Sequence, residues 1–566
     1  MKIFRNLLAT SILVTLAAAP AFGAAQIIIV NRDGPNEGFN DPTAVAPVGG
    51  NPGTTLGEQR RIAFQYAADI WGSVLDSEVP IKIQASFDPL TCTATSGTLG
   101  AAGAIQIFAF NNQDFSELPL TWHHVALANK LVGQDLVVGP SGTNADDIIA
   151  QFNSSLDNPV CLGASGWYYG LDTNHGINQN LVTVLLHEFG HGLGFANFIN
   201  ENTGNLQSGL PDVHSTYTFD IDAGKGWNAM TPAERAASAS NNNRVVWSGI
   251  NVRSAAPGVL STGTVPRLTV NSPNLGVFGV GAAAFGAAMS SPGVTGNLAI
   301  AQDVDEDGAA TVSTATDGCS PITNDLAGKI AVVDRGSCGF AIKVKNAQDA
   351  GAIAVVIADN AAGSPPAGMT GVDPTITIPS GRISLRNANT LKGLLASSTV
   401  NVTLGLRADV LDGADVKGRP YLYAPEPVRL GSSISHFDVS AFPNLLMEPA
   451  INSDLQHGVD LTRAQMVDIG WFTDLDGVPD GVDSCIGSSR SETVVIDGCD
   501  SGVANTVFAN GCRISDQIND CAVAASNHGA FVSCVAHLGN KLKKDGVITG
   551  DQKGAIQSCA GSASIP

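Results

Sequence analysis

The sequence predicts a mixed α/β protein of about three folded units, and three observations support this prediction. The chain has 566 residues, and a folded domain takes roughly 100–200 residues. Segments with strand and helix patterns alternate along the first third, as expected for a mixed α/β unit. The composition then shifts to Gly, Ala, Ser, Val and Thr from about residue 255 to about residue 406, which marks a second unit.

Acidic residues outnumber basic ones by 51 to 30, which gives a formal net charge of 30 − 51 = −21. Such a chain repels phosphate backbones and anionic lipid surfaces, and no long run of Lys or Arg reverses this locally. We therefore expect no nucleic-acid partner. The charge favours solubility outside the cell and the binding of hard cations by clustered Asp residues.

The N-terminus has the pattern of a secretory signal peptide over residues 1–24. Lys2 and Arg5 are followed by an apolar run over residues 7–19 and by small residues up to Ala25. The run is too short to span a bilayer, and no later stretch reaches the length of about 18 apolar residues that a span needs. These features predict a secreted, extracellular protein with no membrane span.

The first unit, over residues 25–254, shows both kinds of apolar period. Apolar residues spaced by three and four predict a helix, whereas alternation or a short apolar run between turns predicts a strand. The predicted strands are Gln26–Val30, Val79–Phe87, Ile105–Phe110 and Asp147–Phe152, and the predicted helices are Glu58–Leu75 and Asn180–Gly194.

Residues 255–406 have the pattern of buried parallel strands around a helix. Helical and polar patterning returns over residues 407–472. Residues 473–566 are rich in Asp and then in Cys, and they end in a predicted helical hairpin from Ile518 to Ala560. The strands of the second unit are Lys329–Val333 and Ala352–Ile357, and its helix is Phe340–Ala350.

The ten cysteines fall into three groups of even size. An exported chain meets an oxidising environment, so even groups indicate disulfides within each unit rather than thiolate metal sites. The first two groups give the expected pairs Cys92–Cys161 and Cys319–Cys338. The six cysteines near the C-terminus leave their pairing open.

The clearest chemical signal is the segment Leu185–Gly194, which reads Leu-Leu-His-Glu-Phe-Gly-His-Gly-Leu-Gly. On a helix, His187 and His191 lie one turn apart on the same face, where two imidazoles bind one ion. Glu188 points about 100° away from His187, so it reaches a water on the metal rather than the metal itself. These residues predict a zinc site that activates water, with Glu188 as the general base for peptide hydrolysis.

This segment resembles the metzincin zinc motif H-E-x-x-H-x-x-G-x-x-H, in which Gly194 takes the glycine position and allows a sharp turn. The motif places a third histidine at residue 197, which is Asn197 here. Because an amide oxygen is a weak zinc ligand, the third ligand either comes from elsewhere or is missing. His214 and Glu201 are the competing candidates.

Three downstream segments complete a resemblance to the leishmanolysin family of metzincins: Ser432–His436, Pro443–Met447 and Leu461–Trp471. The resemblance covers roughly residues 26–254 and 409–472. It implies a metzincin-like catalytic domain that is split by an insertion into residues 25–254 and 407–472. The implied zinc ligands are His187, His191 and His436, and the implied methionine turn beneath the metal contains Met447.

The inserted segment resembles the protease-associated (PA) domain over about residues 255–406. A strand, an Arg-Gly pair, Cys338 and a helix ending before Gly351 follow each other in the order typical of that domain. The resemblance implies an α/β, β-rich domain that serves as a non-catalytic lid or as a substrate-selecting surface. A passive spacer is the alternative.

The segment after the catalytic domain is similar to one thrombospondin type 3 repeat, which implies calcium. The alternative is a solvated acidic linker. In either case we expect a small, Cys-rich and partly helical C-terminal region to follow. The residues that could wrap the ion are Asp474, Asp476, Asp480 and Asp483.

Together these features predict a secreted zinc metalloendopeptidase that acts on protein or peptide substrates. We expect the substrate backbone to pair with an edge strand that follows His123 and His124. Two alternatives stay open. The first is a non-catalytic secreted adhesin or binding protein with a degenerate metal site, and the second is a zinc hydrolase of non-peptide amides.

Overall fold

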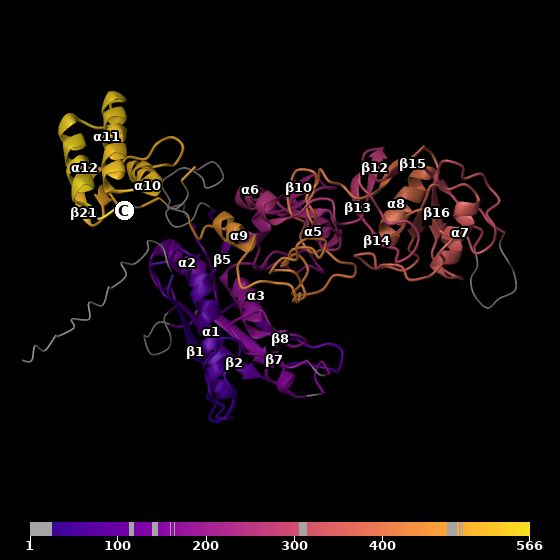
Figure 1. The fold of residues 1–566 in the computed structure, drawn as a ribbon, viewed down its shortest axis with the longest axis horizontal. Coiled ribbons are helices and arrows are strands. Elements are labelled where there is room, and N and C mark those ends of the chain that lie inside the picture. Colours follow the sequence, from indigo (N-terminus) through magenta and orange to yellow (C-terminus); the bar gives the residue numbers. More distant parts are fainter. Residues whose placement is uncertain are drawn as a thin grey trace, which may run out of the picture.

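The structure is a computed structural model with three lobes, which Figure 1 shows as a central lobe between a second lobe and a C-terminal lobe. The signal peptide and the four Asp residues of the calcium segment, both predicted from the sequence, lie outside the described residues. No helix among the described residues is both long and apolar enough to cross a membrane. The described residues are 25–111, 118–137, 145–158, 160–163, 165–304, 314–472, 484–485, 488–489 and 491–565.

The central lobe is built on a four-stranded sheet in the order β1-β2-β6-β3. β1, β2 and β6 are parallel, whereas β3 is antiparallel to β6 and forms one edge of the sheet. Buried and partly exposed residues alternate along β2, so one face of the sheet faces the core. The strands are β1 (Ile27–Asn31), β2 (Ile81–Asp88), β6 (Ile148–Asn153) and β3 (Gly100–Ala104).

Two long helices cover this core. α1 (Leu56–Gly72) begins at a capping box in which Thr55 and Glu58 bond each other's backbone N–H groups. α3 (Leu181–Leu193) packs against α1, β3 and β6, and every residue of α3 except His191 is buried. Because the helix is apolar on nearly all sides, it runs through the middle of the lobe, as Figure 1 shows.

Residues 407–472 return to the central lobe and share its core with the N-terminal part. The helical patterning predicted for this segment is wrong for most of its length, because turns and isolated bridges fill it and only α9 (Thr462–Asp468) is helical. Five prolines between residues 420 and 449 explain the difference, since proline lacks the N–H that a helix interior needs.

The remaining elements of the central lobe are short. They are β4 (Ile107–Ala109), β5 (Trp122–His124), α2 (Val125–Val132), β7 (Trp167–Tyr168), β8 (Gln179–Asn180), α4 (Val213–Thr216), β9 (Thr218–Asp220), β10 (Lys225–Gly226), α5 (Pro232–Ser238), β11 (Val245–Trp247), α6 (Ile250–Val259) and the 3-10 helices Gly38–Asn40, Ser154–Asp157 and Trp227–Ala229.

The second lobe is an eight-stranded sheet in the order β13-β12-β19-β15-β16-β17-β18-β14. β16 and β17 are parallel, as predicted, and every residue of β17 is buried because apolar clusters cover both faces. The elements are β12 (Arg267–Ser272), β13 (Gly276–Gly279), β14 (Gly281–Ala282), β15 (Val294–Ile300), β16 (Ile330–Asp334), α7 (Phe340–Asp349), β17 (Ala354–Ala358), β18 (Ser380–Ile383), α8 (Leu385–Leu395) and β19 (Asn401–Gly405).

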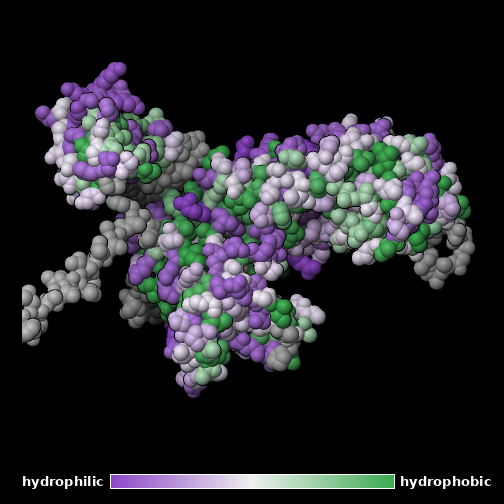
Figure 2. All heavy atoms as spheres, in the orientation of Figure 1, coloured by the Kyte–Doolittle hydropathy of each residue, from purple (hydrophilic) through white to green (hydrophobic). Residues whose placement is uncertain are grey.

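The C-terminal lobe has its own small core of three helices and a β-hairpin. The sequence predicted two helices here, and the structure has three. Asn527 accepts the N–H of Ala530 and so caps a helix that the prediction did not separate from the one before it. Hydrophilic residues gather at the outer end of this lobe (Figure 2). The elements are β20 (Thr493–Ile496), β21 (Cys499–Ala504), α10 (Ile514–Ala524), α11 (His528–Lys544) and α12 (Gly550–Ser562).

All ten cysteines form disulfides. Cys92 joins Cys161 and Cys319 joins Cys338, the two pairs named from the sequence. The C-terminal lobe holds the other three bonds, which tie its hairpin and helices together. These are Cys485–Cys512, Cys499–Cys559 and Cys521–Cys534.

Candidate metal centre

Helix α3 positions two of the candidate ligands and then ends sharply. Asn180 caps its start by accepting the N–H of Thr183 at 3.3 Å. At its other end Gly194 has a φ of +138°, and a Cβ there would lie 2.4 Å from Ile469 Cδ1. A side chain does not fit this turn.

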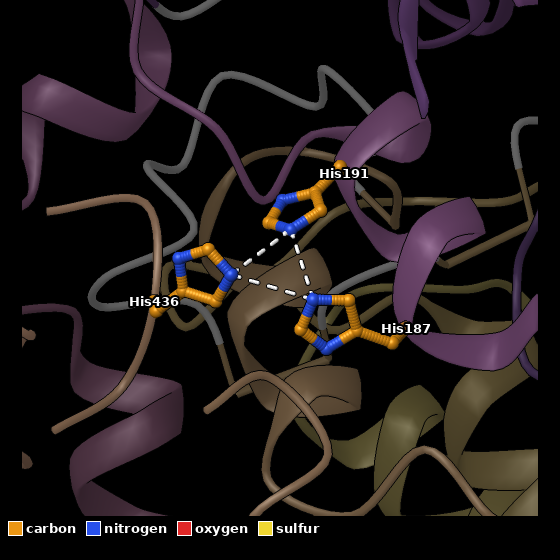
Figure 3. Close-up of side chains that lie close together, drawn as sticks. All are labelled: His187, His191 and His436. Atoms are coloured by element: carbon orange, nitrogen blue, oxygen red, sulfur yellow. Dashed lines mark hydrogen bonds between the residues drawn. The ribbon is translucent and has the colours of Figure 1, made fainter. Parts of the chain in front are cut away.

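Three imidazoles from distant parts of the sequence meet at one point (Figure 3). The Nε2 atom of His191 lies 3.2 Å from Nε2 of His187 and 3.2 Å from Nε2 of His436. The third side of the triangle, between His436 and His187, is 3.3 Å. The structure thus brings His436 to the helical pair although 245 positions separate it from His191.

The hydrogen bonds of the three rings fix which nitrogen carries the proton. Each Nδ1 lies against a backbone carbonyl, which only accepts, so each Nδ1 must donate and each neutral ring keeps a bare Nε2. Burial lowers the pKa of His187 to about 3 and that of His191 to about 4, and it also lowers the pKa of His436, so the rings are neutral. The acceptors are Leu446 O for His187 (2.7 Å), Phe195 O for His191 (2.7 Å) and Ser432 O for His436 (2.8 Å).

Three bare lone pairs that face one point repel each other unless a cation lies between them. In a tetrahedral zinc site with bonds of about 2.0–2.1 Å, two nitrogen ligands lie about 3.3–3.4 Å apart. The observed separations of 3.2–3.3 Å match this geometry. The donor set therefore fits zinc held by three imidazoles with a fourth position open for water or substrate.

The side chain of Glu188 extends from helix α3 to the edge strand β3. Its side chain is buried, which raises its pKa to about 8, while a hydrogen bond from the backbone of Ala102 in β3 opposes this shift. A Cβ on Gly100 would lie 3.1 Å from Glu188 Cγ, so glycine at this position makes room for the carboxylate. The strand Gly100–Ala104 was not predicted from the sequence.

Alternate residues of the edge strand β3 direct their backbone groups away from β6, and one of these groups, the Ala102 N–H, bonds Glu188. Asn153 N donates to Leu99 O and Ile105 N donates to Asp147 O, so alternate residues bond β6. In an antiparallel pair the residues between them direct their N–H and C=O groups outwards. Gly100, Ala102 and Ala104 therefore form the open edge beside Glu188.

The edge strand expected after His123 and His124 is wrong, because helix α2 follows them directly. Both residues lie in β5, which pairs with β4, and both side chains are buried. Burial lowers the pKa of His123 to about 4 and that of His124 to about 3. His124 packs against the ring of Phe198 at 4.6 Å between centroids, so these histidines belong to the core.

Met447 lies directly beneath the helical motif. It is fully buried, and a Cβ on Gly190 would lie 2.8 Å from its Sδ. Two carboxylates hold this turn: Asp460 accepts the N–H of Leu446 at 2.5 Å, and the buried Glu448 accepts that of Leu445 at 2.8 Å. Sequence reasoning missed both, because acidic residues in a turn look like solvated surface.

The competing ligand candidates lie apart from the three rings. His214 is in α4 rather than in a polar loop, and its buried ring packs against Trp247 at 4.9 Å between centroids. Glu201 accepts a hydrogen bond from Asn197 at 3.3 Å. Within the described residues, the three histidines form the sole cluster of side chains able to hold a metal ion.

Comparisons with known proteins identify one part of the chain. Residues 294–391 match the PA domain family, which confirms the PA domain expected from the sequence. The chain is 27% identical over 209 residues to a probable lipoprotein aminopeptidase of Mycobacterium tuberculosis, covering 36% of this chain and 35% of the relative. It is also 35% identical over 92 residues to the minor extracellular protease Vpr of Bacillus subtilis, covering 16% of this chain and 11% of that protein.

The similarity to known proteins is partial. The chain spans about a third of the length of the first of these relatives. Among solved structures, the zinc aminopeptidase BSAP of Bacillus subtilis is 21% identical, with a TM-score of 0.20, and the match covers 28% of this chain and 36% of that one. At this TM-score the likeness does not define the fold.

Proposed function

We propose that this chain is a secreted zinc-dependent endopeptidase. One observation carries the proposal: three neutral imidazoles present bare Nε2 atoms to one point at 3.2–3.3 Å, with the carboxylate of Glu188 on the next residue of the helix. The metzincin and leishmanolysin resemblance supports this reading, because it implies the same distant third histidine and a methionine beneath the site. The names of two relatives, an aminopeptidase and an extracellular protease, agree with a peptidase.

The chain's own residues suit the hydrolysis of an amide. Zinc, when bound by His187, His191 and His436, acts as a Lewis acid that polarises a carbonyl and acidifies a water. Glu188 accepts a proton from that water at its carboxylate and releases it to the departing amine nitrogen, so water adds across the cleaved C–N bond. The carbonyls bonded to each Nδ1 hold the rings in the ligating tautomer throughout.

An extended peptide fits the open edge of β3. The outward N–H and C=O groups of Gly100 and Ala104, with the C=O of Ala102, can pair with a substrate backbone as an added strand, whereas the Ala102 N–H bonds Glu188. Such pairing grips the middle of a peptide and needs no free terminus. It therefore favours an endopeptidase over an aminopeptidase, and protein or peptide substrates over other amides.

The wider organisation belongs to the same proposal. It comprises a signal peptide over residues 1–24, a catalytic domain split into residues 25–254 and 407–472, and a PA domain that selects substrates. Calcium binding by Asp474, Asp476, Asp480 and Asp483 stays a prediction.

The substitution Glu188→Gln tests the function. We expect the purified variant to hold as much zinc as the wild type and to lose about 100-fold or more of its cleavage of a peptide library, since general-base catalysis is worth roughly 10²–10⁴-fold. Glu201→Gln is the matched control, because this buried glutamate touches none of the three rings and the amide keeps its Oε1 acceptor. Full activity of the Glu188→Gln variant refutes the proposal, and a zinc-loaded wild type without peptidase activity favours a binding protein.

A further inference from the structure

Asn197, at the position where the consecutive motif has its third histidine, contacts the segment that carries His436. Its Nδ2 donates to Ser435 Oγ at 2.9 Å and to Ser433 O at 3.5 Å, and its backbone N donates to Ser435 Oγ at 3.1 Å. Both Ser433 and Ser435 are buried. These bonds span 236 to 238 positions of the sequence and hold the turn on both sides of Ile434.

The backbone of this turn is strained, so it needs hydrogen bonds that hold it in place. Ile434 has a φ of +67°, in the left-handed region that a β-branched residue rarely adopts. Strained conformations persist only where the surroundings over-determine them. Here Ile434 N also donates to Tyr423 O at 2.7 Å, and Tyr423 N donates to His436 O at 2.9 Å, so the turn is fixed from two directions.

The other side of the contact is fixed to the zinc helix. Phe195 O, two residues before Asn197, accepts the Nδ1 proton of His191 at 2.7 Å. The side-chain oxygen of Asn197 accepts the N–H of Ile199 at 3.0 Å, which holds the amide in one orientation. One short segment therefore orients His191 through Phe195 and reaches the turn of His436 through Asn197.

We propose that Asn197 is a positioning residue that fastens the turn Ser433–Ser435 to the end of the zinc helix, and so places His436 beside His191. The inference rests on the proposed function, because it takes the ion to be zinc. Without the contact the turn keeps its bonds to Tyr423 but loses those that join it to the end of the zinc helix, so the third imidazole is held less closely beside the other two. Groups that orient metal ligands from behind typically change metal affinity by about 10–100-fold.

Zinc affinity, measured by competition with a chromophoric chelator, tests the inference. We expect Asn197→Ala and Ser435→Ala each to weaken zinc binding by about 10–100-fold. The double variant should lose less than the two single losses combined, because both single variants remove the bond from Asn197 Nδ2 to Ser435 Oγ. Replacement of zinc by cobalt(II) gives a second readout, since its absorption spectrum reports loss of one imidazole. Asn200→Ala is the control, because Asn200 lies in the same loop and caps a turn at Thr203 N (3.0 Å) without touching residues 432–436.

A third variant guards against misfolding. Asn197→Asp keeps the shape of the side chain but replaces the donor by a carboxylate that faces Glu201 Oε1, 3.3 Å away, so it should also weaken zinc binding. Zinc bound as tightly by Asn197→Ala as by the wild type overturns the inference, and so do losses that add in the double variant. A wild type that binds zinc but cleaves no peptide contradicts the proposed function and leaves this inference standing. The effect of Asn197→Ala on zinc binding then still tests the inference.

Discussion

Gly190 and Met447 are in direct contact: a Cβ on Gly190 would lie 2.8 Å from the sulfur of Met447. The glycine within the histidine motif therefore leaves space for the methionine that lies beneath it. The carbonyl of Leu446, one residue before Met447, accepts the Nδ1 proton of His187. The packing of the methionine and the orientation of the candidate metal ligand His187 are thus linked through one turn.

Gly190→Ala should disturb both the packing of Met447 and the orientation of His187. The added methyl displaces Met447 and with it Leu446 O, so we expect a loss of about 1–3 kcal/mol in the free energy of unfolding, as for other overpacked cores, together with weaker zinc binding. Gly393→Ala in α8 is the control, since a Cβ there meets nothing within 4 Å. It should be neutral or stabilising. Chemical denaturation measures the free energy of unfolding of both variants. A Gly190→Ala variant that is as stable as the wild type contradicts the packing argument.

Glu448 should make the stability of the metal-free protein depend on pH. Burial raises its pKa to about 8, whereas the unfolded chain has the usual value near 4.5. Between these values the folded state binds the additional proton, so the free energy of unfolding falls as pH rises from about 5 to about 8. We expect Glu448→Gln to lose less stability than the wild type over this window, by an amount on the order of a few kcal/mol. Denaturation curves in a zinc chelator at several pH values measure the difference, and parallel profiles contradict it.

Removal of the metal should lower the melting temperature. The three Nε2 lone pairs then face each other without a cation, and binding free energy that favours the folded state is lost. We expect a chelator to lower the melting temperature, added zinc to restore it, and His436→Ala to abolish the response. His175→Ala is the control, because this ring bonds Asn178 O and Ser453 O instead. A chelator response that persists in His436→Ala contradicts the ligand assignment.

Two arginines are among the residues that join the PA domain to the central lobe. Arg386 of α8 donates to Ser240 Oγ at 3.0 Å, and Arg244 donates to Leu275 O and lies over the ring of Phe278 at 5.0 Å. If the PA domain selects substrates, Arg386→Ala should raise KM for a folded protein substrate several-fold and leave kcat for a short peptide unchanged. Steady-state kinetics on both substrates measure this, and equal effects on the two contradict a selecting role.

The parts of the fold and site that sequence could predict depend on local patterns. The helix Asn180–Gly194 has its apolar period, its cap and its glycine stop within fifteen residues, so its existence and the facing of His187 and His191 follow from helical geometry. His436 could be named only through the order of segments in a resembling family. Nothing in its own neighbours marks it as a ligand.

Other features depend on contacts that no local pattern records. β3 reads Gly-Ala-Ala-Gly-Ala and lacks the β-branched residues typical of strands, yet it is a strand because β6 pairs with it. Glu448 and Asp460 resemble surface acids until the turn that they hold is known. The role of Asn197 depends on its contact with Ser435, which lies 238 positions away, so no local pattern could predict it.

The most direct test of the central claim is a crystal structure of the zinc-loaded protein, with data collected at the zinc absorption edge. We expect one strong anomalous peak about 2.0–2.1 Å from Nε2 of His187, His191 and His436, with Glu188 beside the remaining position. A zinc ion bound elsewhere, or a ring of His436 turned away from an ion held by the other two, would contradict it.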